Sequence, residues 1–265
     1  MPLKDKLVEL VKSHSENNTP DPNREMLQEC LRTIKNPEVR REERLDALKD
    51  RQLMNGIRGN LERGTPGKGL RHTLAVSVTL MDGSFEWRTP GMNGFYAELM
   101  KRCMMSDNTR GMQHFLNAGP TQQTLNCWES VLLGLYCLDQ VTDEQVYDNL
   151  YKVLESESAM PDFETWRQLG FTMNEEYRRE EGPLQSSQPP GPGRLLYYVP
   201  ADKEGTITQE YPNHIAVSVG NGQAQSLWNQ PGGINSVQNI DVNNTFTEHR
   251  IFLGDPGQVF PRSDG

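Results

Sequence analysis

The sequence predicts an α+β fold, in which a helical N-terminal half is followed by a strand-rich C-terminal half. Two patterns carry this expectation. Apolar residues recur at helical spacing within the highly charged first 63 residues. Beyond residue 193, short segments of alternating apolar residues are separated by turn residues, as is typical of antiparallel strands. A stretch rich in proline and glycine, 182–193, precedes the strands and is expected to form a loop.

The first 63 residues are expected to form a charged helical extension. Leu3, Leu7 and Leu10 show the helical repeat. The segment "RGTPGKG" at 63–69 then changes the character of the chain. We therefore place a domain boundary here, with 1–63 as the extension and 64–265 as an α+β domain that contains the 182–193 loop.

The central part of the chain is expected to contain one hairpin and several helices. "HTLAVSVTLMDGSFEWRT" alternates around Asp82–Gly83, a dipeptide that tolerates the positive φ of a tight turn, and so predicts a hairpin. Helices are expected in five other segments, which are 94–105, about 126–139, from 142 onward, and within 161–170 and 174–182.

Five segments of the C-terminal part have the length and alternation of strands. They are 194–200, 206–212, 214–220, 224–229 and 249–254.

Composition and charge exclude several classes of function. The formal net charge of −9 argues against non-specific binding of nucleic acid. No apolar run reaches the roughly 18 residues of a membrane-spanning helix. The charged start of the chain lacks the apolar stretch of a secretory signal, so we expect a cytoplasmic protein or one secreted by a signal-peptide-independent route.

The sequence predicts neither a metal site nor a cofactor. The four cysteines are too widely spread for a zinc ribbon and too few for a disulfide scaffold, so reduced thiols are expected. No phosphate-binding loop and no metal-ligand spacing are present.

Cys127 is the candidate nucleophile because it stands at the start of the 126–139 helix. Asn126 occupies the N-cap position, and Glu129 completes a capping-box pattern. The free N–H groups of a first helical turn favour a negative charge, lower the pKa of a thiol and can receive an oxyanion. The alternative is a packed structural cysteine, as expected for Cys137 in the same helix.

His214 is the candidate general base. It opens the expected strand 214–220, where it shares its face with small residues only, which leaves room beside its ring. Asn229 ends the next expected strand and would orient the imidazole through a hydrogen bond. Asp241 is the alternative orienting residue.

"NCW" at a helix start, followed downstream by "HIAVSVGNG" and "SLWN", resembles the papain-like cysteine peptidases and, more loosely, the NlpC-type amidases. The resemblance covers about residues 118–232. It implies a nucleophile helix that packs on an antiparallel sheet from the C-terminal half, within a catalytic domain 64–265. Cys127, His214 and Asn229 match the catalytic triad, and Gln122 or Gln123 matches the glutamine that donates to the oxyanion.

His72 is an alternative base. "HTLAVSVTLMDGSFEW", which begins at His72, echoes "HIAVSVGNGQAQSLW", which begins at His214. We favour His214 because its strand leads to an amide orienting residue.

The resulting hypothesis is a thiol hydrolase that cleaves a peptide, isopeptide or side-chain amide bond through an acyl-thioester. Its expected partner is a protein or peptide substrate. One alternative is a glutamine deamidase or transglutaminase-type effector with the same triad. The other, from a different class, is a non-catalytic interaction protein that keeps the fold. The substrate and the oligomeric state are left open.

Overall fold

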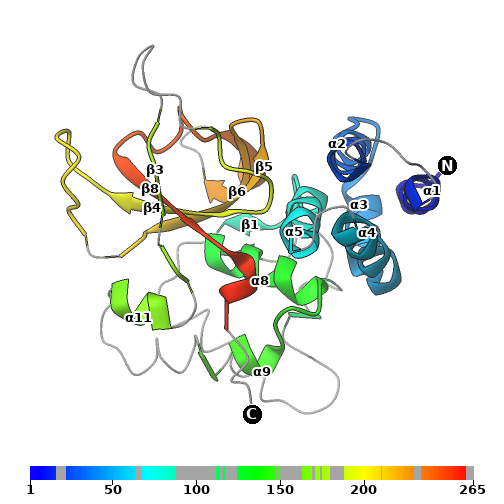
Figure 1. The fold of residues 1–265 in the computed structure, drawn as a ribbon, viewed down its shortest axis with the longest axis horizontal. Coiled ribbons are helices and arrows are strands. Elements are labelled where there is room, and N and C mark those ends of the chain that lie inside the picture. The colour runs from blue at the N-terminus through cyan, green and yellow to red at the C-terminus, as the bar shows by residue number, and fades with distance from the viewer. Residues whose placement is uncertain are drawn as a thin grey trace.

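The computed structural model confirms the α+β class and places the helices beside one six-stranded antiparallel sheet (Figure 1). It describes residues 1–15, 22–63, 67–87, 112–113, 116, 124–146, 148–149, 163–168, 171–173, 175–179, 188–209, 211–229 and 234–260.

The sheet has the order β3-β8-β4-β5-β6-β7, and every neighbouring pair is antiparallel. Its strands are β3 (Glu175–Tyr177), β4 (Leu195–Pro200), β5 (His214–Gly220), β6 (Gln223–Asn229), β7 (Asn235–Asp241) and β8 (His249–Gly254). A separate parallel pair is formed by β1 (Glu86–Trp87) and β2 (Thr124–Leu125).

The longer helices lie on one side of the molecule and beneath the sheet. They are α1 (Leu3–Ser15), α2 (Pro22–Ile34), α3 (Arg41–Lys49), α4 (Arg51–Arg63), α5 (Gly69–Leu80) and α8 (Cys127–Cys137). Shorter elements are α9 (Asp143–Val146), α11 (Phe163–Gln168) and the 3-10 helix η2 (Pro256–Gln258). In Figure 1, α5 stands between the first four helices and the sheet, and it contacts α2, α4, α8 and β5.

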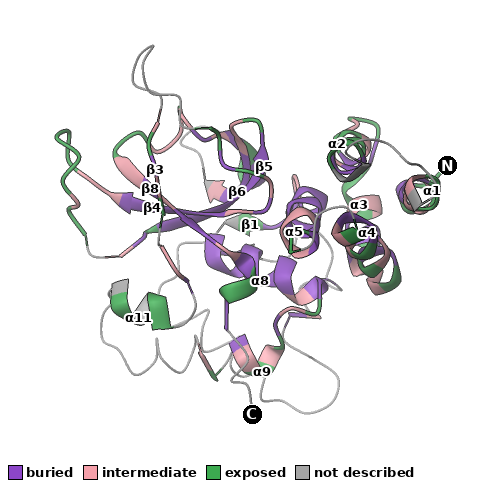
Figure 2. Cartoon of the chain, viewed as in Figure 1, coloured by how far each residue is buried: buried purple, intermediate pink, exposed green. Residues whose placement is uncertain are grey.

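Two hydrophobic clusters cover the two faces of the sheet. The helix-side core contains Ile215 and Val217 of β5 together with apolar residues of α1–α5 and α8. The outer core contains Tyr198, Ala216 and Ala224 on the opposite face. This alternation along β5 follows from the two-residue period of a strand. Figure 2 shows the result, with α5, α8 and the central strands mostly buried and the outer faces of α1–α4 exposed.

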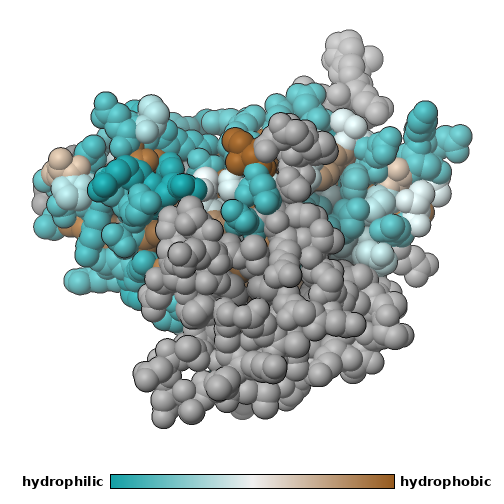
Figure 3. Space-filling model, turned by 180° about the vertical axis from the view of Figure 1, so that it is seen from behind, coloured by the Kyte–Doolittle hydropathy of each residue, from teal (hydrophilic) through white to brown (hydrophobic). Residues whose placement is uncertain are grey.

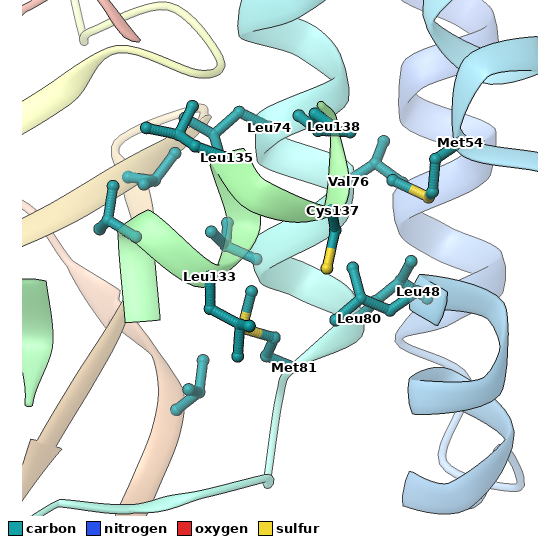
Figure 4. Close-up of a cluster of buried hydrophobic side chains, with 14 of the residues drawn as sticks. Leu48, Met54, Leu74, Val76, Leu80, Met81, Leu133, Leu135, Cys137 and Leu138 are labelled. Atoms are coloured by element: carbon teal, nitrogen blue, oxygen red, sulfur yellow. The ribbon is translucent and has the colours of Figure 1, made fainter. Parts of the chain in front are cut away.

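The helix-side core joins the N-terminal helices to the rest of the chain. Leu7 of α1 and Met54 of α4 belong to the same cluster as Leu74 of α5 and Leu133 of α8. Figure 4 shows part of this packing, where side chains from α3, α4, α5 and α8 meet. The domain boundary after residue 63 stays a prediction.

The hairpin expected over 72–89 is wrong, because its first arm is the helix α5. Thr73 through Leu80 are all buried, and a run that is buried on every side fits a helix surrounded by core as well as a strand. The hydroxyls of Thr73 and Thr79 donate to the carbonyls of Gly69 and Ala75 one turn earlier. These bonds satisfy the buried hydroxyls within the helix.

Other expectations differ in the same half of the molecule. Within 174–182 the structure has strand β3 and not a helix, and 206–212 forms only an isolated bridge between Ala201 and Ile207. Strand β7 was not expected from the sequence. The expected helix at 94–105 lies outside the described residues.

The described surface on the reverse side of the molecule is mostly hydrophilic, as Figure 3 shows. This agrees with a mean hydropathy of −0.71. In the ranges that the structure describes, the helices are all too short or too polar to cross a membrane.

Candidate active site around Cys127 and His214

Helix α8 begins at Cys127, as expected. The Asn126 side chain accepts a hydrogen bond from the Glu129 amide at 2.9 Å, and the Glu129 carboxylate accepts one from the Asn126 amide at 2.8 Å. This confirms the capping box. Two amides of the helix start are therefore satisfied reciprocally, and the thiol is fixed in the first turn.

Cys127 is only 5% exposed, and backbone N–H groups act on its sulfur. The backbone amides of Ile215 and Trp128 act on the sulfur and favour the thiolate. Burial has the larger effect and raises the pKa of the Cys127 thiol to about 12, and the Glu129 carboxylate acts in the same direction. In this conformation the thiol is therefore protonated at neutral pH.

The other described cysteines provide a comparison. Cys30, Cys127 and Cys137 are all free and buried, and burial raises each pKa to about 12. Figure 4 shows Cys137 among aliphatic side chains such as Leu48 and Leu80. Backbone N–H groups act on the sulfur of Cys127 alone among these three thiols. This is the physical difference between Cys127 and a merely packed cysteine.

His214 opens β5 as expected, and its ring lies in the outer core. Its Nε2 is 2.5 Å from the Oγ of Ser226 on β6. The ring of Phe246 lies 4.4 Å away between centroids, in the space that the small neighbours of His214 leave. Burial first and the nearby His249 second lower the pKa of His214 to about 3, so the ring is neutral at physiological pH.

The structure does not bring the His214 ring next to the Cys127 sulfur. The sulfur meets the amide of Ile215, whose side chain belongs to the helix-side core, whereas the His214 ring belongs to the opposite face. No hydrogen bond joins the two side chains, both of which lie in described parts of the chain. The expected contact between the His214 ring and the Cys127 sulfur is therefore not formed. Adjacent residues of a strand point to opposite faces, so Ile215 faces α8 and His214 faces away from it.

The alternative site residues lie elsewhere. His72 belongs to α5 and lines a cleft with Gly220, at the end of β5 remote from His214. Asp241 pairs with Gln223 at that same remote end, and its carboxylate accepts the amides of the turn that follows β7. Neither residue is therefore beside the thiol and the His214 ring.

The remaining predicted residues are only partly described. Asn229 ends β6 opposite Asn235, at the His214 end of the sheet as expected. Its side chain lies outside what the structure describes, as do Gln122 and Gln123.

Sequence reasoning missed two residues that set the position of the His214 ring. Ser226 is the hydrogen-bond partner, and the alternation Ala224, Ser226, Trp228 along β6 is the signal that places it on the outer face. Phe246 comes from the turn between β7 and β8. The guanidinium of Arg179 holds that turn by donating to the carbonyls of Val242, Thr245, Phe246, Thr247 and His249.

Comparisons with protein-family models, with curated proteins and with solved structures find no match. Within the described ranges, no three His, Cys, Asp or Glu side chains gather in a way that would hold a metal ion. Function is therefore argued from the geometry of Cys127 and its surroundings.

Proposed function

We propose that the chain is a thiol hydrolase of papain-like architecture that cleaves a peptide, isopeptide or side-chain amide bond. The observation that carries the proposal is the set of backbone N–H groups around the Cys127 sulfur at the capped start of α8. Such donors stabilise a thiolate and also the oxyanion that forms when the thiolate attacks a carbonyl. The packing of α8 against β5 supports the architecture.

In the reaction, the Cys127 sulfur attacks the carbonyl carbon and His214 takes the thiol proton. The same imidazolium then protonates the leaving amine as the C–N bond breaks, which leaves an acyl-thioester. Water hydrolyses the thioester and restores the thiol. A deamidase or a transglutaminase shares these steps and differs in the amide attacked or in the acceptor of the acyl group.

This chemistry requires the His214 ring to leave Ser226 and reach the helix side. The pairing of β5 with β6 runs from Gly220 to Val217, whereas the pairing of β5 with β4 continues through Ile215 and His214. The Ile215 amide, which favours the Cys127 thiolate, lies where the pairing with β6 has ended. The conformation described is thus a resting arrangement, and the reactive one needs movement at the start of β5.

The second candidate is a non-catalytic interaction protein with the same fold. The neutral His214 ring on the far face and the raised pKa of Cys127 favour this alternative. The two candidates make opposite predictions about the reactivity of the thiol.

The test is alkylation of the native protein by iodoacetamide at pH 7, followed by peptide mass spectrometry. The hydrolase proposal predicts that Cys127 reacts at least about tenfold faster than the control thiol Cys137, because only a thiolate is a good nucleophile. His214→Ala should slow Cys127 toward Cys137, and Ser226→Ala should accelerate it by releasing the ring.

The contrary outcome is equally specific. If Cys127 and Cys137 react at the same slow rate until denaturant unfolds the chain, the thiol is structural and the interaction protein is the better assignment. Circular dichroism of each variant shows whether a change in rate reflects a change in folding.

A further inference from the structure

A cleft of about 810 Å³ lies between α2, the start of α5, the segment 188–192 and the turn from β5 to β6. It is distant from the thiol site, because it lies at the Gly220 end of β5. Its volume is within the range of roughly 300–1,000 Å³ that is usual for small-molecule sites.

The charge of this cleft is opposite to that of the whole chain. Arg24 and Arg32 of α2, Lys35 directly after α2, and Lys68 line it, and none of its described lining residues is Asp or Glu. The chain as a whole has a net charge of −9. Cations gathered in a concave surface of an acidic protein create a local field that attracts anions.

A second cleft, of about 620 Å³, differs from the first in the charge of its lining residues. It is lined by residues of both signs. The acidic residues are Glu176, Asp202, Glu204 and Glu248, and the basic ones are Arg178, Arg179, Lys203 and Arg250. Of these two clefts, the first is the one whose described charged lining is basic throughout.

The wall formed by the 188–192 segment is held in place by neighbouring elements. The Ser218 hydroxyl donates to the Pro190 carbonyl at 2.7 Å, and the Gly193 amide donates to the Ser218 carbonyl at 2.7 Å. Gly193 also lies so close to α5 that a Cβ there would be 1.7 Å from the Arg71 carbonyl oxygen. A wall fixed in this way loses little conformational entropy when a ligand binds.

One cation of the cleft is already oriented. The Lys35 ammonium donates to the Asn239 side chain at 3.1 Å, and the Asn239 amide donates in turn to Gln223. Burial lowers the pKa of Lys35, although Asp82 acts in the opposite direction. An ammonium that has lost part of its hydration gains most from a ligand anion.

Part of the lining of the cleft is apolar. Leu27 and Val219 are buried within it, and Leu31 is partly buried beside them. Guanidinium groups such as those of Arg24 and Arg32 bind phosphate oxygens in pairs. We propose that this cleft is a binding site for a phosphate-bearing organic anion, with the phosphates on the cations and the organic part against the apolar part of the lining.

The test is isothermal titration calorimetry of the full chain with adenosine triphosphate, tripolyphosphate and adenosine at low salt. Adenosine triphosphate should bind most tightly, because it has both the phosphates and the apolar part. The double variant Arg32→Gln, Lys35→Gln should weaken its binding by about tenfold or more. The matched control, Arg178→Gln, Lys203→Gln, removes the same charge from the second cleft and should change affinity by less than about twofold.

Three results would overturn the assignment. They are no binding of any probe to the parent chain, equal weakening by the two double variants, and tripolyphosphate binding as tightly as adenosine triphosphate. Thermal unfolding of each variant without ligand establishes that its fold is retained. The result is independent of thiol reactivity, which is measured at the other end of β5.

Discussion

Replacement of His214 by Gln should remove a large acid-dependent loss of stability. An unfolded histidine binds a proton below its ordinary pKa of 6.5, whereas burial lowers the pKa of His214 in the folded chain to about 3. Between these values the unfolded state holds one more proton, so the free energy of unfolding falls as pH falls, by about 1.4 kcal/mol per pH unit. From pH 7 to pH 4 this single group therefore contributes about 3 kcal/mol of lost stability.

The assay is urea unfolding of the parent and His214→Gln at intervals from pH 4 to pH 8, followed by tryptophan fluorescence. Carboxylates titrate in both proteins, so their effect cancels in the difference between the two curves. That difference should be constant above pH 7 and should change by about 3 kcal/mol in favour of the variant between pH 7 and pH 4. Parallel curves over the whole range would refute the reasoning, because the ring would then ionise in the folded chain as it does in water.

Two further predictions concern backbone geometry and are tested by the same unfolding measurement. Gly193→Ala should cost about 3 kcal/mol or more, because its φ is +76° and the new Cβ would overlap the Arg71 carbonyl; Gly222→Ala, with a similar φ of +72° and open space around it, should cost only about 1 kcal/mol. Equal losses would show that the contact with Arg71 is not a constraint. Asn126→Ala should cost about 1 kcal/mol through loss of the α8 cap. An unchanged midpoint would mean that the cap contributes nothing to stability.

Local signals in the sequence predicted the start of α8 well. A capping box is made by residues three apart, so Asn126 and Glu129 define it without information from the rest of the fold. The segments of β5 and β6 were equally accessible, because alternation and the Gly220–Gly222 turn are local features.

The environment of an apolar segment could not be predicted in this way. The run from Thr73 to Leu80 contains several β-branched residues, which favour a strand, yet the surrounding core accommodates it as a helix. The sequence also could not show whether His214 lies on the face of the sheet that packs against α8. Chain order places a histidine at a strand start, but only the packing of α8 shows that Ile215 and not His214 faces the thiol.

One contact made by Cys127 has a mechanical consequence. The Ile215 amide acts on the sulfur at a point where the pairing of β5 with β6 has already ended. Any group attached covalently to that sulfur would change this contact between α8 and the start of β5. The first residues of β5 would then be held by their pairing with β4 alone, for as long as the adduct lasts.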